Sequence, residues 1–310
     1  MTKTRQTLFA LLTILALVAA ACGSSSGTAT EGETADAEDA EGSGDSEEAS
    51  GGDGDDVRAA FVMVAPVGDA GWNFQHDLGR QGAEAATGIE TAFVESIPEG
   101  GAEFDEAVQN FIDDGFNLIF ATSFGYQDAT LAFANDNPDV TFEHISGFLM
   151  NDTNMGNTFG RMYQPRYIAG MAAGAATESD TIGYVAAFPI PEVIRGINAF
   201  ALGVQAVNPD AVVEVNWTST WFGIPEETVA AQALIDSGAD VLSMHQDSTA
   251  TGLAISEAGG TFIGYHSDMS AQVDAYLTAP VWDWTPRYTE IIEAVEAGTY
   301  TPEALSLIHI

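Results

Sequence analysis

Short apolar runs alternate with longer segments of helical periodicity along most of the chain, and this pattern predicts an α/β fold. Strands are expected at 61–64, 117–121, 141–145, 182–187, 211–217, 240–244 and 261–265. Segments with apolar residues three or four apart predict helices at 75–87, 102–114, 161–177, 192–206, 226–237 and 286–297. Strands that alternate with helices favour parallel sheets covered by helices on both faces.

The pattern occurs twice, which predicts two similar lobes. Residues 112–119 read IDDGFNLI and residues 235–242 read IDSGADVL, an offset of 123. The same offset places Phe61 on Tyr184 and Pro66 on Pro189. A repeat of this length indicates duplicated domains rather than a solenoid. We therefore expect two doubly wound parallel-sheet lobes with a hinged cleft between them.

The expected boundaries follow from this layout. The N-terminal lobe should span 57–148 and the C-terminal lobe 149–269, with residues 149–160, rich in Asn, Thr and Gly, forming the first crossing between them. Residues 270–310 should return to the N-terminal lobe. Because the pattern after Gly298 resembles an unfinished unit, we expect the fold to continue beyond residue 310.

The loops that follow the strands collect aromatic and polar side chains. In open α/β sheets, ligands bind outside the carboxyl ends of the strands. Aromatic faces with a few hydrogen-bonding groups suit a flat, neutral ligand with polar edges, such as a nucleobase or a sugar. The candidate ligand-binding residues are Asp69, Trp72, Asn73, Phe124, Tyr126, Phe188, Trp221, Asp247, His266, Asp268 and Trp282.

The first 56 residues have a different composition. Residues 1–22 combine Lys3 and Arg5 with an apolar run and small residues before Cys22, which is typical of an export signal. Residues 23–56 contain twelve acidic residues and no basic ones, and they lack the apolar groups that a core needs. They predict a disordered acidic tether. Cys22 is the only cysteine, which excludes a disulfide framework and cysteine-based catalysis.

The charge of the chain narrows the classes of partner. From residue 57 to 310 there are 34 acidic residues and six arginines, with no lysine. No basic stripe is present to replace counterions on a phosphate backbone, so nucleic-acid binding is excluded. The same excess of negative charge disfavours an anionic ligand.

An enzyme is the competing class. His245 with Asp247 and His266 with Asp268 form two His-x-Asp pairs that could meet as a metal-dependent hydrolase site. Their spacing matches no established metal motif. The sequence also contains no phosphate-binding loop of the Walker type and no GxSxG nucleophile motif. We therefore expect a binding protein without catalytic residues, metal or cofactor.

Several runs resemble the basic-membrane-protein family of ABC-transporter substrate-binding lipoproteins. They are GDAGWNFQHDLGR, ATSFGYQD, YVAAFPIPEVIRGINAF, ALIDSGADVL, HQDS, GYHSDMS and LTAPVWDW, and they cover about 57–300. The resemblance implies a fold like that of type I periplasmic binding proteins. It also implies a monomer that binds a purine nucleobase or nucleoside and delivers it to an ABC transporter permease. Cys22 would carry a lipid anchor that holds the protein at the extracytoplasmic face of the cell membrane. An ordinary small-residue cleavage site is the alternative, because Ala19 stands where lipoprotein signals usually carry Leu.

The resemblance also implies roles for single residues. Asp69, Trp72 and Asn73 match the family's first-loop positions. Trp221 matches an aromatic residue that stacks on the base, and Asp268 matches an aspartate that binds ribose hydroxyls in nucleoside binders.

The sequence departs from the family pattern at two places. Trp282 stands where nucleoside binders carry a lysine, and Gly223-Ile224 replaces Asp-Pro. The missing lysine favours a free base such as adenine. A receptor or sensor for another neutral solute, such as a sugar, is the alternative.

Overall fold

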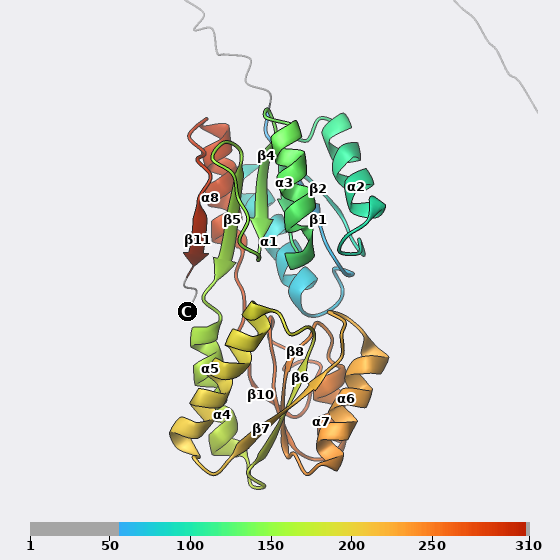
Figure 1. Ribbon diagram of the computed structural model, residues 1–310, viewed down its shortest axis with the longest axis vertical. Helices are drawn as coiled ribbons and strands as arrows, with labels where there is room; N and C mark the ends of the chain where they lie inside the picture. The colour runs from blue at the N-terminus through green and yellow to red at the C-terminus, as the bar shows by residue number, and fades with distance from the viewer. Residues whose placement is uncertain (1–55, 308–310) are drawn as a thin grey trace, which may run out of the picture. The chain divides into compact units, whose positions relative to one another are not determined.

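The computed structural model describes residues 56–307 (Figure 1). The expected export signal, Cys22 and all but the last residue of the expected tether lie outside the described residues. Within 56–307, none of the helices combines the length and apolar character that crossing a membrane requires.

The first lobe is built on a six-stranded parallel sheet with the order β11-β5-β4-β3-β1-β2. Its strands are β1 (Arg58–Val62), β2 (Glu90–Val94), β3 (Leu118–Ala121), β4 (Thr141–Ile145), β5 (Met155–Gly160) and β11 (Ala304–Leu307). Its helices are α1 (Trp72–Thr87), α2 (Ala102–Asp113), α3 (Gln127–Asp136) and α8 (Thr285–Glu296), with a 3-10 turn at Phe124–Tyr126.

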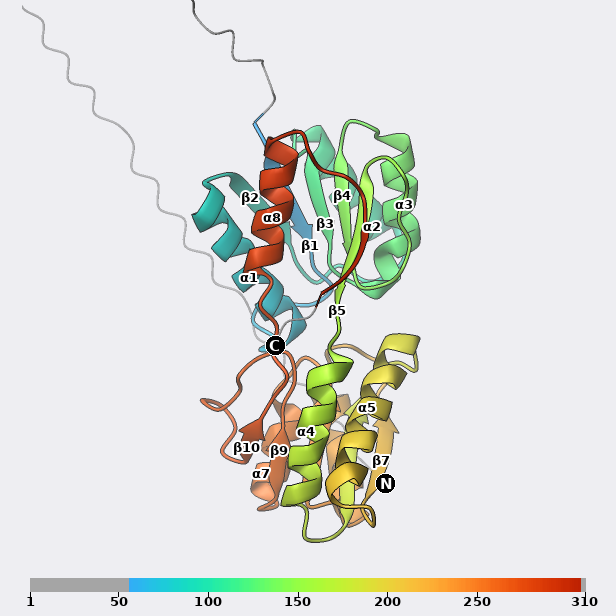
Figure 2. The ribbon, with the colours of Figure 1, turned by 90° about the vertical axis from the view of Figure 1, so that its left-hand side faces the viewer.

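Both faces of this sheet are covered by helices, as the alternating pattern predicts. Helices α2 and α3 lie on one face, where Phe104 stacks on Tyr126 with ring centroids 4.4 Å apart. Helices α1 and α8 pack together on the other face (Figure 2). There Phe61 of β1 stacks on Phe120 of β3 at 4.4 Å, and Tyr288 of α8 packs against both rings.

The second lobe repeats this arrangement with a five-stranded parallel sheet in the order β10-β9-β8-β6-β7. Its strands are β6 (Thr181–Ala186), β7 (Val212–Trp217), β8 (Val241–His245), β9 (Thr261–Ile263) and β10 (Tyr276–Thr278). Its helices are α4 (Tyr163–Ala176), α5 (Pro191–Val207), α6 (Ile224–Asp236) and α7 (Ala250–Glu257). Five strands of each sheet follow the same order in space, so the predicted pair of similar lobes is confirmed.

The chain changes lobe later than the sequence suggested. Residues 155–160 are not a crossing segment but strand β5, which pairs with β4 in the first sheet. Their polar side chains are buried in that sheet, where Asn157 bonds to His144 at 3.0 Å and Thr158 donates to Glu143. Asn and Thr form hydrogen bonds to buried groups here instead of facing solvent. Their presence therefore wrongly suggested a crossing segment rather than a strand.

Two crossings occur within residues 56–307. The first follows β5 directly and enters α4, as Figure 2 shows. The second runs from β10, which still belongs to the second sheet, to α8 in the first lobe. Helix α8 packs on α1 of the first lobe, whereas residues 276–278, within the expected return segment 270–310, still form β10 of the second sheet.

Candidate functional site

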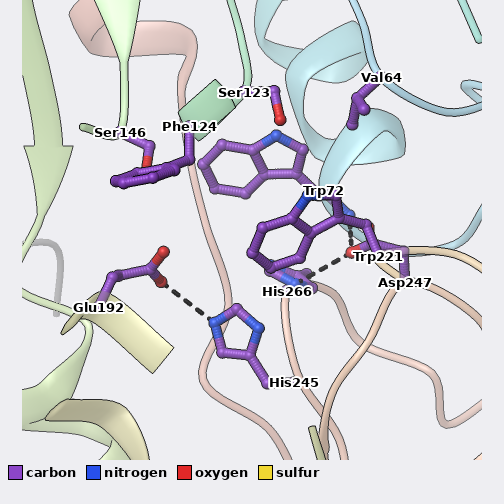
Figure 3. A pocket seen from close by; sticks show the side chains of 10 residues that line it. All are labelled: Val64, Trp72, Ser123, Phe124, Ser146, Glu192, Trp221, His245, Asp247 and His266. Atoms are coloured by element: carbon purple, nitrogen blue, oxygen red, sulfur yellow. Dashed lines mark hydrogen bonds and ion pairs between the residues drawn. The ribbon is translucent and has the colours of Figure 1, made fainter. Parts of the chain in front are cut away.

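The carboxyl ends of the strands enclose a pocket with about 360 Å³ of space not filled by protein atoms. Residues from both sheets line it (Figure 3). They are Val64, Trp72, Ser123, Phe124, Ser146, Glu192, Trp221, His245, Asp247 and His266. A pocket that combines aromatic rings with several convergent polar groups is typical of a small-molecule site.

The first lobe shapes its side of the pocket through the loop before α1. Asp69 accepts hydrogen bonds from the backbone N–H groups of Gly71 at 2.7 Å and Phe74 at 3.0 Å, so it caps the N-terminus of α1. Asn73 donates to Asp69 at 2.7 Å and accepts from the Ala65 N–H at 3.3 Å. Both polar side chains are buried and engaged within the loop, and neither lines the pocket.

This loop fixes Trp72 at the start of the helix. Its indole N–H donates to the Thr122 carbonyl at 2.6 Å. The ring meets His266 edge-on at 5.7 Å between centroids and Trp282 at 5.6 Å. Trp72 therefore forms a rigid wall where the two lobes meet.

The second lobe contributes a buried Asp–His pair whose protonation can be assigned. The Trp282 indole N–H, which can only donate, bonds to Nδ1 of His266 at 2.9 Å. The proton on His266 must then sit on Nε2, which lies 3.1 Å from Oδ1 of Asp247. Burial, together with the nearby His245, lowers the pKa of His266 well below its usual range, consistent with a neutral ring.

His266 has φ of 70° and Ser146 has φ of 78°, so two pocket residues hold a backbone conformation that costs energy.

The carboxylates at the site have unusual affinities for protons. Burial raises the pKa of Asp247 to about 7, although the Trp72 N–H donates to it at 3.1 Å. Burial and the charge of Asp247 raise the pKa of Asp69 to about 7 as well. Burial alone would raise the pKa of Glu192, but the attraction of His245, 3.1 Å away, holds it below its ordinary value.

Trp221 closes the pocket from the second lobe. Its indole N–H crosses to the first lobe and donates to Glu99 at 2.9 Å. Glu99 also accepts from the Ser123 hydroxyl at 2.5 Å and from the Gly125 N–H at 2.7 Å, beside Phe124. Phe188 supports Trp221 from behind, with ring centroids 5.0 Å apart, and does not line the pocket itself.

The two lobes also touch through their backbones. A Cβ added at Gly71 would lie 2.5 Å from the Cα of Asp247, closer than real Cβ contacts allow. The Ser267 hydroxyl donates to the Ala70 carbonyl next to this contact. The structure therefore shows the lobes closed on each other.

Five of the predicted residues line the pocket, and the other six lie elsewhere. Trp72, Phe124, Trp221, Asp247 and His266 come together as expected. Besides Asp69, Asn73 and Phe188, the remainder are Tyr126, Trp282 and Asp268. Tyr126 is buried inside the first lobe and donates to the Ile97 carbonyl at 2.5 Å. Trp282 lies behind His266 and orients it.

Asp268 differs most from expectation. It is exposed and accepts a hydrogen bond from the Ser270 N–H at 2.9 Å, so it turns into its own loop rather than into the pocket. His245, Asp247 and His266 of the two His-x-Asp pairs therefore meet in the pocket, whereas Asp268 does not join them. Within 56–307, His, Asp and Glu side chains form no group of three or more suited to a metal ion.

Sequence reasoning missed four lining residues, namely Val64, Ser123, Ser146 and Glu192, and considered His245 only for the competing metal site. Glu192 lies in the first turn of α5, and the others follow or end strands. Identifying these residues from the sequence would have required knowing the direction in which each loop turns. Glu99, which links Ser123 to Trp221, comes from the β2–α2 loop, and no sequence pattern marked it as a site residue.

Comparisons with known proteins agree on the class of protein. The family model described as ABC transporter substrate-binding protein, PnrA-like, matches residues 56–307. A putative ABC transporter glucose-binding protein of Haloferax volcanii is 42% identical over 285 residues, 91% of this chain and 70% of that protein. A purine-binding protein of Brucella abortus is 40% identical over 247 residues, 79% of this chain and 70% of that protein. An ABC transporter nucleoside-binding protein of Lactococcus lactis is 26% identical and covers 67% of this chain and 61% of that protein.

Solved structures show the same fold at low sequence identity. An ABC transporter solute-binding protein of Aeropyrum pernix superposes with a TM-score of 0.72 at 18% identity, covering 81% of this chain and 74% of that one. A solute-binding protein of Conexibacter woesei gives 0.64 at 21% identity, covering 81% and 85%. With the family match over 56–307 and relatives at 40% identity or more, this chain belongs to the PnrA-like family of ABC transporter substrate-binding proteins, which are not enzymes.

Proposed function

We propose that this protein binds a purine nucleobase or nucleoside in the pocket between its lobes and delivers it to an ABC transporter permease. The observation that carries the proposal is the composition of the pocket wall. Trp72 and Phe124 of the first lobe and Trp221 of the second surround a space that also contains the buried Asp247. A purine is flat, apolar on both faces and polar at its edges, which matches such a wall.

The polar groups of the pocket support a neutral ligand with both donors and acceptors. Asp247 and Glu192 offer acceptor oxygens, and the hydroxyl of Ser146 can donate or accept. A base edge can bond to both acceptors and donors. The relatives named purine-binding and nucleoside-binding support this interpretation.

A sugar is the second candidate, because the relative of Haloferax volcanii is named as a glucose-binding protein and is 42% identical over most of this chain. Sugars also stack on aromatic rings. They present hydroxyl groups around their whole rim, and six of the ten lining residues are polar, so direct identification of the ligand decides between the two candidates.

The test is to identify the ligand directly. Mass spectrometry of the small molecules released when the purified protein is denatured should show a purine. Titration calorimetry with hypoxanthine, adenine, inosine, adenosine and glucose should then give binding for at least one purine and none for glucose. Binding of glucose alone would overturn the purine proposal and leave the substrate-binding role in place.

We further propose that Cys22 carries a lipid anchor and that the acidic segment 23–56 tethers a monomeric two-lobed body to the extracytoplasmic membrane face. The support is the apolar run, the small residues before Cys22 and the family membership. The protein with Cys22 should partition into a detergent phase, and a Cys22→Ser variant should not. Equal partitioning of the two would count against the anchor.

A further inference from the structure

A second, smaller cavity adjoins the pocket on its second-lobe side. It contains about 210 Å³ of space not filled by protein atoms and shares Glu192 and His245 with the pocket. We call it the Arg166 chamber. Its lining residues are Phe159, Met162, Tyr163, Arg166, Glu192, Arg195, Gly196, His245 and Tyr265.

The His245 ring connects the two spaces. Its centroid lies 6.0 Å from that of Trp221 in the pocket and 4.8 Å from that of Tyr265 in the chamber. The His245 ring therefore stands between the two spaces, and a ligand that reaches the chamber from the pocket has to pass it. Nδ1 of His245 has no hydrogen-bond partner, so the passage itself has an unused polar atom.

Arg166 is the unusual residue of the chamber. It projects from α4 and is only 1% exposed, with its guanidinium carbon 3.3 Å from the centre of the Tyr265 ring. One nitrogen, Nη1, donates to the Met244 carbonyl at 2.8 Å. Nε and Nη2 are buried and have no partner in the structure. Leaving two donors of a buried charged group unbonded costs several kcal/mol, so a missing acceptor is indicated.

The position of the free donors specifies what kind of acceptor fits. The N–H groups of Nε and Nη2 lie parallel along one edge of the planar guanidinium, and such an edge binds two neighbouring acceptor atoms at once. A carboxylate or a phosphate has that geometry, and so does a neutral ring with two adjacent acceptors.

The proposed purine function selects the neutral ring. The charged residues that line the chamber are Arg166, Arg195 and Glu192, and a purine adds no charge to them. Among purines, a 6-oxopurine presents O6 and N7 side by side, and an arginine bonds to both. Adenine places an amino donor at the same position, where it would face the guanidinium donors.

We propose that the Arg166 chamber is the subsite for the oxo edge of a 6-oxopurine, with Nε and Nη2 of Arg166 donating to N7 and O6 of the base. The inference rests on the proposed purine function and selects hypoxanthine, guanine or their nucleosides over adenine.

The experiment is titration calorimetry of the full chain with hypoxanthine, 7-deazahypoxanthine and adenine. Hypoxanthine should bind about 10- to 100-fold more tightly than adenine, the range that one or two charged hydrogen bonds provide. The 7-deaza compound, which lacks the N7 acceptor, should bind about tenfold more weakly than hypoxanthine.

Variants then assign the preference to the residue. Arg166→Met, of similar length and without donors, should reduce the hypoxanthine-to-adenine ratio to about threefold or less. Arg166→Lys keeps the charge but loses the paired edge, and it should lose the ratio too. Arg58→Met is the control, because it removes an arginine that pairs with Glu90 at 2.8 Å on the first lobe, and it should keep the wild-type ratio.

The outcomes separate the two proposals. If purines bind without preference for the oxo group, or if Arg166→Met keeps that preference, the subsite is wrong and the purine function stands. If glucose binds and no purine does, both are wrong. If both Arg166 variants fail to fold, the three-ligand series on the wild-type protein decides the question alone.

Discussion

At the scale of single residues, Trp221 makes the clearest contribution to the pocket. It is the aromatic side chain of the second lobe that lines the space, and its indole N–H is held by Glu99 of the first lobe. Stacking of a base on an aromatic ring contributes about 1–3 kcal/mol when tested by alanine substitution. Trp221→Ala should therefore weaken purine binding roughly 5- to 150-fold in titration calorimetry.

The control for this variant is Trp217→Ala. Trp217 ends β7 in the same lobe, is 39% exposed and does not line the pocket. It should leave affinity within about twofold of wild type, as expected for a surface substitution. If Trp221→Ala binds a purine as tightly as Trp217→Ala does, the pocket described here is not the ligand site.

Asp247 should make stability depend on pH. Its pKa is about 7 in the folded protein against 3.8 as an ordinary value, so the folded state holds a proton that the unfolded state releases. The stabilisation is complete below about pH 4 and is lost as pH rises to about 7. In Asp247→Asn the amide oxygen can still accept from the Trp72 N–H, and the titration is gone.

The measurement is chemical denaturation at pH 5 and pH 8. From pH 5 to pH 8, Asp247→Asn should become more stable relative to wild type. Asp69 and Glu227, whose pKa values are also raised to about 7 by burial, titrate in the same window. His76, His144 and His266, whose pKa values burial lowers, act in the opposite direction, so the comparison with wild type carries the test. Asp268→Asn, which changes an exposed carboxyl, should behave like wild type. An unchanged difference between Asp247→Asn and wild type at the two pH values would mean that Asp247 is ionised throughout.

At the scale of elements, the contact between α4 and α5 depends on glycine. A Cβ at Gly203 would lie 1.9 Å from the Tyr167 carbonyl oxygen, and one at Gly170 would lie 2.0 Å from that of Phe200. The neighbouring atoms are backbone and cannot turn away. Gly203→Ala should therefore separate the helices and lower the free energy of unfolding by about 1–3 kcal/mol or more.

Gly196→Ala is the matched control, because it lies on the same helix and its Cβ would come no closer than 3.9 Å to another atom. Alanine is favoured over glycine inside a helix by about 1 kcal/mol, so this variant should be as stable as wild type or more so. Thermal denaturation of the two variants measures the difference. Equal stability would show that α4 and α5 can move apart without cost.

The elements also show what sequence could and could not predict. The offset of 123 residues placed β6, α6 and β8 correctly, because buried strands and amphipathic helices leave a periodic pattern. Strand β5 was missed because its Asn and Thr serve buried partners. In the pocket, strand exits identified Trp72 and Asp247 but not Glu192 in the first turn of α5, since the direction of a side chain after a strand exit is set by packing that periodicity does not encode.

At the scale of the whole described body, the closed state depends on contacts that form only between lobes. Three of them are the Trp72 N–H to Asp247, the Trp221 indole to Glu99 and the Ser267 hydroxyl to Ala70. The first two of these contacts involve residues that line the pocket or that bond to a residue lining it. Closure and ligand binding should therefore be coupled, because each contact that favours closure also completes the site.

A substitution at Gly71 tests whether lobe closure and ligand binding are coupled. An added Cβ would meet the Cα of Asp247 at 2.5 Å and its carbonyl oxygen at 2.8 Å, so Gly71→Ala should hold the lobes apart. When the binding-competent state becomes rarer, apparent affinity falls by the same factor. We expect at least a tenfold loss of affinity and a larger radius of gyration by small-angle X-ray scattering in the presence of ligand. Gly68→Ala in the same loop, with no atom within 4 Å of its Cβ, should match wild type.

Local strain is the competing explanation for a loss in Gly71→Ala, since its φ of −121° and ψ of −123° lie outside the main regions for residues with a Cβ. Glu99→Ala separates the two, because it removes the bond to Trp221, together with those from Ser123 and Gly125 in the first lobe, without altering the loop before α1. The compactness with ligand, rather than affinity alone, then reports on closure. If closure controls binding, both variants should bind more weakly and stay expanded with ligand, and Glu99→Ala should do so without destabilising α1. If Gly71→Ala alone loses affinity and both proteins remain as compact as wild type, the contact between Gly71 and Asp247 shapes the loop and does not control closure.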